Sequence, residues 1–149
     1  MGVFKHESLS EMLAAIERGR LSFAQLQRPV SAEDVSALPI PVIAAIRRPD
    51  DAQRLPEVVL GRLRAVLLDD SEGAGSRSGW AALGARPRVA ADLFLAGGLD
   101  ESCVGAAIRS LRPDGVDVAT GVESSLGVKD RGRMERFIAA VREEDSAAR

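Results

Sequence analysis

The sequence has few of the residues on which metal and redox sites depend. Its single cysteine, Cys103, excludes an intramolecular disulfide and any metal site built from several cysteines. Its single histidine, His6, leaves no pair of imidazoles for a zinc centre. We therefore expect no bound metal, and the cysteine content fits a reducing compartment.

Long apolar runs and an excess of one charge are also missing. No apolar run reaches the roughly 18 residues that a membrane helix needs, and the opening MGVFKHESLS is too polar for a signal peptide. The 20 basic residues are balanced by 22 acidic ones, so no basic excess indicates nucleic acid as a partner. We expect a cytoplasmic protein that binds neither a membrane nor nucleic acid.

The residues that are present predict an α/β protein. Its 149 residues, 46% apolar and 28% charged, are typical of one globular domain that spans residues 1–149. Short apolar runs alternate with amphipathic stretches, which is typical of βαβ units around a parallel sheet. The expected strands cover residues 2–5, 21–26, 42–46, 65–68, 93–96 and 116–120. About six βα units at this spacing indicate a (β/α) barrel.

Capping patterns locate the helices between these strands. Ser8 with Glu11, and Ser31 with Asp34, have the spacing of a capping box at a helix start. Pro56 interrupts the next helical stretch, where we expect a bend or a late start. Further helices are expected over residues 100–111 and 131–144, and a Gly/Ser loop over residues 71–79.

Two glycine segments at strand ends are candidate phosphate sites. In LAGGLDES, Gly97 and Gly98 follow a strand and precede a predicted helix, where backbone N–H groups can bind a phosphate. In VDVATGVESS, the strand ends at Thr120, and Gly121 permits close approach of the backbone. Two such sites after the last two strands match the phosphate position of (β/α)8 barrels. A Gly-Gly pair can also simply form a tight turn.

Two aspartates lie on or next to strands. Asp69 ends the AVLL strand, on the face where barrels carry their active sites, and is a candidate acid or base. It could equally cap the loop that follows. Asp117 alternates with Val116 and Val118, so it is either a carboxylate in the barrel interior near the ligand or half of a structural ion pair.

Four other residues are interpreted without a role in chemistry. Cys103 falls inside a predicted helix, away from any strand end, and is expected to be a small packing residue. His6 has no histidine partner and is interpreted as a solvated loop residue. Trp80 is expected to anchor a short helical turn at residues 80–83, and Lys129 to be a surface charge.

The segment LAGGLDESCVGAAIRSLRPDGVDVATGVESSLGVKD resembles the C-terminal signature of phosphoribosylanthranilate isomerase, a (β/α)8 enzyme of tryptophan biosynthesis. The resemblance lies in the order AGGL, a helix ending in RP, GVDV, GVES and GVKD. It extends back through VLLD, EGAGSRSGW, VIAAIR and the QL of LSFAQLQ to GVF at the start. It covers all 149 residues, which match the third to eighth βα units, so the expected fold is an incomplete (β/α)8 TIM barrel.

The resemblance implies an intramolecular aldose-ketose isomerase that uses no cofactor. The family converts N-(5-phosphoribosyl)anthranilate to 1-(2-carboxyphenylamino)-1-deoxyribulose 5-phosphate by an Amadori rearrangement. Asp69 matches the aspartate that protonates the furanose ring oxygen. The family's phosphate grip falls on Gly97, Gly98 and Gly121 with its neighbour Thr120. Asp117 matches the aspartate of GVDV and is expected near the substrate amine.

Some family residues have no match in the sequence. The general-base cysteine of a CGIT-like motif and an arginine that holds the anthranilate belong to the first two βα units. We therefore expect a shortened isomerase sequence, with two alternatives. One is a catalytically impaired module that binds a phosphorylated ligand, and the other is a subunit completed by another chain. The open edges of the first and last strands predict self-association or pairing with a complementing segment.

Overall fold

The computed structural model describes residues 1–69 and 86–147. The chain folds into two compact units, residues 1–68 with 87–94 and residues 69–86 with 95–149, and each is described by itself. The predicted Gly/Ser loop and the turn at Trp80 lie outside the described residues. The single domain expected from the sequence stays a prediction.

Parallel strands form the centre of the first unit. They are β1 (Gly2–Phe4), β2 (Ala24–Leu26), β3 (Val42–Ile46) and β4 (Leu63–Asp69), and each pairs in parallel with the next along the chain. All three residues of β2 and four of the five of β3 are buried, so the alternating side chains of these strands are shielded from solvent on both faces. The prediction of a parallel α/β sheet is confirmed for these strands.

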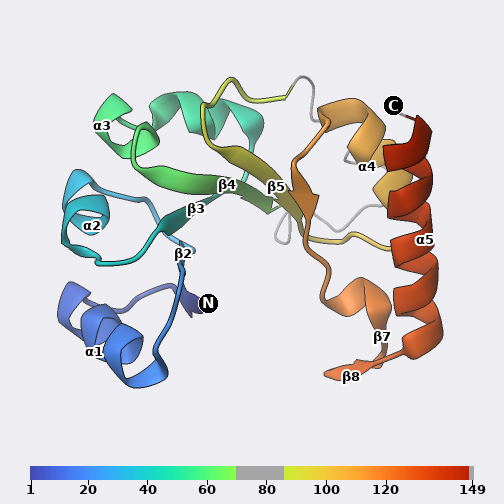
Figure 1. Cartoon of the computed structure of the whole chain (residues 1–149), viewed down its shortest axis with the longest axis horizontal. Helices are drawn as coiled ribbons and strands as arrows, with labels where there is room; N and C mark the ends of the chain where they lie inside the picture. Colours follow the sequence, from blue (N-terminus) through green and yellow to red (C-terminus); the bar gives the residue numbers. More distant parts are fainter. Residues whose placement is uncertain (70–85, 148–149) are drawn as a thin grey trace. The chain divides into compact units, whose positions relative to one another are not determined.

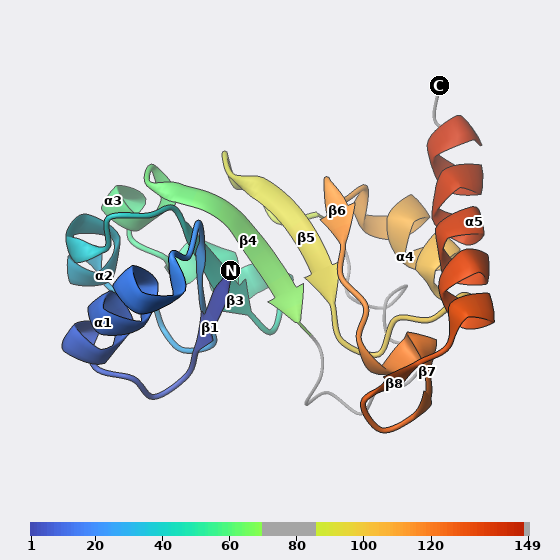
Figure 2. The ribbon, with the colours of Figure 1, turned by 60° about the horizontal axis from the view of Figure 1, so that its bottom comes forward.

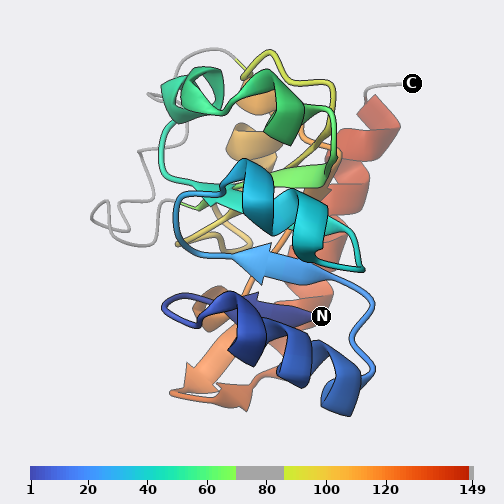
Figure 3. The same cartoon turned by 90° about the vertical axis from the view of Figure 1, so that its left-hand side faces the viewer.

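The helical segments between these strands lie along one side of them (Figures 1 and 3). They are α1 (Leu9–Gly19), α2 (Ala32–Ala37), the 3-10 helix η1 (Pro49–Arg54) and α3 (Glu57–Leu60). Both predicted capping boxes are present, at Ser8 and at Ser31. Pro56 separates η1 from α3, which confirms the predicted interruption.

The second unit contains a helix pair and a small hairpin. Its elements are β6 (Gly115–Val116), α4 (Val104–Leu111), the 3-10 helix η3 (Thr120–Val122), β7 (Glu123–Ser125), β8 (Val128–Lys129) and α5 (Arg131–Ala147). Helix α4 lies beside α5, and an ion pair between Arg109 and Glu144 joins them (Figure 2). Phe137 of α5 and Leu111 of α4 are buried in this unit.

Strand β5 (Asp92–Ala96) belongs partly to each unit, and the order of the sheet is β1-β2-β3-β4-β5-β6. The order follows the chain, as it does when each strand is followed by a crossover to its neighbour. β1 and β6 are the two end strands of this order. Within residues 1–69 and 86–147, no helix is long and apolar enough to cross a membrane.

Several predicted boundaries were wrong. β2 begins at Ala24 instead of residue 21, and β4 begins at Leu63 instead of residue 65. The last strand is only Gly115–Val116, because the chain turns into η3 where the valine pattern had suggested a strand to residue 120. The hairpin of β7 and β8 was not predicted, because ESSLGVK lacks an alternating apolar pattern.

Candidate active site

The candidate site residues follow three neighbouring strands of the sheet. Asp69 ends β4, Gly97 follows β5, and Asp117 follows β6. The order of the sheet places β5 between β4 and β6. The division between the two units falls at the end of β4, so Asp69, its last residue, is the first residue of the second unit. The other five candidate residues also belong to the second unit, namely Gly97, Gly98, Asp117, Thr120 and Gly121.

The loop after β5 depends on its two glycines. Gly97 has φ of 89° and Gly98 has φ of 64°, a region in which a side chain is strained. The loop continues into a turn closed by Asp100, whose Oδ1 accepts hydrogen bonds from the backbone N–H groups of Ser102 at 2.8 Å and Cys103 at 3.1 Å. The glycines are therefore needed for the path that the chain takes in this loop.

The start of the following helix differs from the prediction. Asp100 was expected to cap a helix that runs directly from it, but α4 begins at Val104, with Cys103 at its N-cap. The Asp100 carboxylate instead closes the turn that precedes the helix. Gly97 and Gly98 are thus separated from the helix N-terminus, and a direct effect of the helix dipole at these glycines is not supported.

Gly121 brings the second glycine segment against the first. A Cβ built on Gly121 would lie 1.8 Å from the Leu99 carbonyl oxygen and 3.2 Å from the Asp100 Cα. Real Cβ atoms do not approach backbone atoms this closely, so only glycine fits. The predicted close approach of backbone at Gly121 is present, and the two glycine segments are in direct contact.

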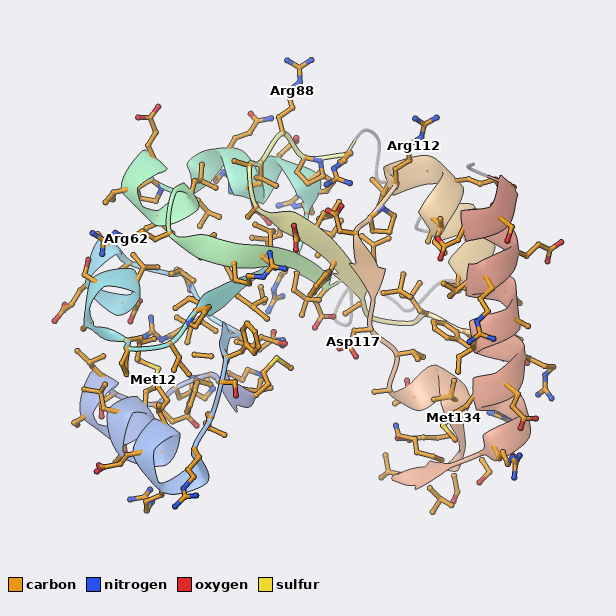
Figure 4. The ribbon with its side chains drawn as sticks, viewed as in Figure 1. Met12, Arg62, Arg88, Arg112, Asp117 and Met134 are labelled. Atoms are coloured by element: carbon orange, nitrogen blue, oxygen red, sulfur yellow. The ribbon has the colours of Figure 1, made fainter. Side chains whose placement is uncertain are left out.

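Asp117 lies outside the strand in which the sequence placed it. β6 ends at Val116, and the backbone N–H of Asp117 donates to the Leu95 carbonyl oxygen at 2.8 Å. Asp117 is exposed and lies on the segment that leads from β6 to η3 (Figure 4). No ion pair of Asp117 is found in the described part of the chain, which leaves its carboxylate available to a ligand there.

The turn η3 carries Thr120 and Gly121 and is held by the hairpin that follows it. Lys129 Nζ donates to the Ala119 carbonyl oxygen at 2.9 Å and to Glu123 Oε1 at 2.7 Å. The Lys129 ammonium, together with the backbone N–H of Gly127, lowers the pKa of the Glu123 carboxyl group. Lys129 is exposed, as predicted for a surface charge, but its pair with Glu123 was not predicted, although opposite charges on both sides of Gly127 indicate a hairpin.

Three remaining predictions concern single residues. Asp69 is half-buried at the C-terminal end of β4, as predicted. His6 is exposed in the segment after β1, in agreement with a solvated loop residue. Cys103 is buried, as predicted, but lies at the N-cap of α4 instead of inside the helix, with its Sγ 3.6 Å from the Gly98 carbonyl oxygen.

Comparison with known proteins identifies the family. Residues 1–140 match the family described as N-(5'phosphoribosyl)anthranilate (PRA) isomerase. The chain belongs to this family. The N-(5'-phosphoribosyl)anthranilate isomerase of Roseiflexus castenholzii is 40% identical over 152 residues, which cover 95% of this chain and 69% of that protein.

Solved structures of PRA isomerases agree with the fold. Monomers of the dimeric isomerase from Thermotoga maritima match with a TM-score of 0.67 and 28% identity, covering 95% of this chain and 70% of that one. A PRA isomerase in complex with reduced 1-(o-carboxyphenylamino)-1-deoxyribulose 5-phosphate matches with a TM-score of 0.66 and 29% identity, over 95% and 70% of the two chains. The predicted (β/α)8-type fold and the predicted family are confirmed.

No group of three or more histidine, cysteine, aspartate or glutamate side chains in residues 1–69 and 86–147 could hold a metal ion. The candidate site of this PRA isomerase chain is therefore built from backbone groups of two glycine segments and from two carboxylates, Asp69 and Asp117.

Proposed function

We propose that the chain acts as an N-(5'-phosphoribosyl)anthranilate isomerase in tryptophan biosynthesis. Membership of the PRA isomerase family supports this function. The ligand of the solved relative carries a 5-phosphate and a carboxyphenylamino group. The substrate of this chain is then a phosphorylated sugar joined to anthranilate. The site must bind its phosphate and its amine with different groups of the protein.

The contact between Gly121 and Leu99 is the main evidence for the position of the phosphate subsite. It joins the Gly97–Gly98 loop to the turn that holds Thr120 and Gly121. Backbone N–H groups from two segments can then converge on one anion without a cationic side chain. We assign the substrate phosphate to Gly97, Gly98, Thr120 and Gly121.

The two carboxylates take the other roles. We propose that Asp69, at the end of β4, protonates the furanose ring oxygen so that the ring opens. A base must then take the proton from C2, and protonation of the resulting enolamine at C1 completes the change from aldose to ketose without a cofactor. Of these two proton-transfer groups the sequence matches only the acid, Asp69, so turnover needs another group to take the C2 proton. Asp117 is exposed beside the second glycine segment, where it can accept a hydrogen bond from the substrate amine.

The conversion of phosphoribosylanthranilate by the purified chain and by Asp69→Asn tests this function. Turnover is measured as the disappearance of the substrate over time. We expect Asp69→Asn to lose turnover by about 10²–10⁴-fold, the usual contribution of a general acid. Its dissociation constant for ribose 5-phosphate should stay within about threefold of wild type, because amide and carboxylate have the same size. An unchanged turnover in Asp69→Asn would show that Asp69 is not the acid.

The same assay separates two alternatives. Binding of ribose 5-phosphate without any turnover favours a module that binds a phosphorylated ligand. Turnover that appears only when a second polypeptide is added favours a subunit completed by another chain. Turnover by the purified chain alone contradicts both alternatives.

We also propose that the chain self-associates or pairs with a complementing segment through β1. The Gly2 N–H donates to the Phe23 carbonyl oxygen, and the Phe4 carbonyl oxygen accepts from the Gln27 N–H. Because residues of a strand alternate in direction, the N–H and C=O of Val3 face away from β2. The Val3 side chain is 55% exposed. This edge is open to another strand.

Light scattering on the purified chain tests this association. We expect a dimer or larger species, and a smaller one for Val3→Pro, because proline removes the N–H and blocks pairing at that edge. A monodisperse species of 15.8 kDa for the wild-type chain would contradict the proposal. A cytoplasmic location is a further proposal, supported by a sequence with a single cysteine, which excludes an intramolecular disulfide.

A further inference from the structure

We propose that Lys129 is a positioning residue that fixes the direction of the Thr120 backbone N–H in the phosphate subsite. This inference rests on the proposed function, because that function assigns Thr120 and Gly121 to the substrate phosphate. Lys129 itself lies on β8, the second strand of the hairpin that follows the turn η3. It acts through the backbone and does not need to touch the ligand.

The ammonium group of Lys129 joins the two ends of the turn. Ala119 is the N-cap of η3 and Glu123 is its C-cap. Lys129 Nζ lies 2.9 Å from the Ala119 carbonyl oxygen and 2.7 Å from Glu123 Oε1. One side chain therefore holds both the residue before Thr120 and the residue after Val122, and it limits how far the turn can open.

Glu123 is itself held in place. Its second carboxylate oxygen, Oε2, accepts the backbone N–H of Gly127 at 3.1 Å, and Glu123 pairs with Lys129 in the hairpin register. Its side chain is only 11% exposed, against 44% for Lys129. The Glu123 carboxylate, held on both of its oxygens, places the more exposed Lys129 side chain within reach of the Ala119 carbonyl oxygen.

The geometry of the peptide bond carries the constraint to Thr120. No cis peptide bond is found in residues 1–69 and 86–147, so the Ala119 carbonyl and the Thr120 N–H point in opposite directions across one planar group. When Lys129 holds the carbonyl, the Thr120 N–H is turned to the side away from the hairpin. The Asp130 N–H holds the Val122 carbonyl oxygen at 2.8 Å in the same way. The hairpin and the start of α5 thus fix carbonyl groups on one side of the turn.

The charge of Lys129 is already balanced by Glu123. Long-range attraction of the phosphate by the ammonium is accordingly weak, and the effect of Lys129 on binding is one of position. Positioning and long-range attraction predict different results. If Lys129 acts by position, a cationic side chain that donates both hydrogen bonds should replace it, and removal of a nearby cation that donates neither should leave phosphate binding unchanged.

Calorimetric titration with ribose 5-phosphate tests the proposal. We expect Lys129→Met to weaken binding about three- to tenfold, the effect of one misplaced hydrogen bond. Lys129→Arg should restore binding to within about twofold, because guanidinium can donate to both oxygens at once. Arg131→Met is the matched control. Arg131 is two residues from Lys129 in the sequence and forms an exposed ion pair with Glu135, so its removal should leave binding as in the wild type.

The outcomes separate this inference from the proposed function. If the wild-type chain does not bind ribose 5-phosphate, both are overturned. If it binds and Lys129→Met binds equally well, only the role of Lys129 is overturned. Equal weakening in Lys129→Met and Lys129→Arg, or in Arg131→Met, would also contradict it. If Lys129→Met fails to fold, Glu123→Ala serves instead, and unchanged binding in that variant overturns the proposal.

Discussion

Gly121 lies so close to Leu99 that a Cβ on Gly121 would come within 1.8 Å of the Leu99 carbonyl oxygen. This contact holds the two glycine segments of the candidate site together, and no side chain can be accommodated in it. A substitution of Gly121 should therefore change both the free energy of unfolding and the affinity for the ligand.

Gly121→Ala should lower the free energy of unfolding by about 1–3 kcal/mol, because the backbone of one segment must move away from the other. Binding of ribose 5-phosphate should weaken in the same variant. Gly61→Ala is the control, because a Cβ there meets its nearest atom at an ordinary 3.5 Å and φ is −68°. Chemical denaturation and calorimetry measure the two effects, and a Gly121→Ala chain as stable as Gly61→Ala would refute the close contact.

Gly98→Val should abolish detectable binding of ribose 5-phosphate. Gly98 has φ of 64°, which costs an L-residue about 1–2 kcal/mol, and a branched side chain would block approach to the backbone of the loop. The measurement is calorimetry at millimolar ligand on a variant whose circular dichroism shows that it is folded. A folded Gly98→Val chain that binds as well as wild type would exclude this loop from the phosphate subsite.

Asp34 should stabilise the first unit in a pH-dependent way. Burial raises the pKa of its carboxyl group, but hydrogen bonds from the Arg28 guanidinium, at 2.7 and 2.9 Å, and from Ser31 outweigh burial and leave the pKa below its ordinary value. A lowered pKa in the folded state means that this stabilisation is present above the ordinary aspartate pKa. It is lost as the pH falls through the folded value.

Asp34→Ala should accordingly cost about 2–3 kcal/mol near neutral pH, where it removes a half-buried ion pair and a helix cap. The difference from wild type should shrink in acid, below the folded pKa of Asp34. Glu135→Ala, which breaks an exposed pair, should change stability by less than about 0.5 kcal/mol. Urea unfolding at several pH values checks this, and a difference for Asp34→Ala that grew in acid would have the wrong sign.

Cys103 should support the glycine loop without taking part in proton transfer. Its Sγ accepts from the Asp100 N–H at 3.3 Å and lies 3.6 Å from the Gly98 carbonyl oxygen, and the residue is buried. Cys103→Ser keeps a group that can donate and accept at this place, so turnover of phosphoribosylanthranilate should change by less than about threefold. A loss of the 10²–10⁴-fold size expected for a general base would instead assign chemistry to the thiol.

The regular elements could be predicted because their signals are local. Ser8 and Ser31 cap α1 and α2 through side chains three residues away, and Pro56 lacks the N–H that a continuous helix needs. The apolar run of β3 was also predicted at its full length. Each of these features depends on a few neighbouring residues, which a single sequence displays.

The elements that were missed depend on contacts distant in sequence or on competing patterns. The alternation of Val116 and Val118 predicted a strand that continues to residue 120. The strand ends earlier, because the chain turns into η3 after the Asp117 N–H has donated to the Leu95 carbonyl oxygen. The glycine positions of the site were predicted, but the reason that Gly121 must be glycine lies in Leu99, 22 residues earlier. The roles of Lys129 and Glu123 likewise depend on the fold of the hairpin.

The central claim is that the two glycine segments form one phosphate subsite. Amide chemical shifts of the ¹⁵N-labelled chain, followed during titration with ribose 5-phosphate, test it most directly. We expect the largest shifts at Gly97, Gly98, Thr120 and Gly121, all with one dissociation constant, because a single anion would contact both segments. Shifts confined to one segment, shifts concentrated elsewhere in the chain, or none at millimolar ligand would contradict the claim.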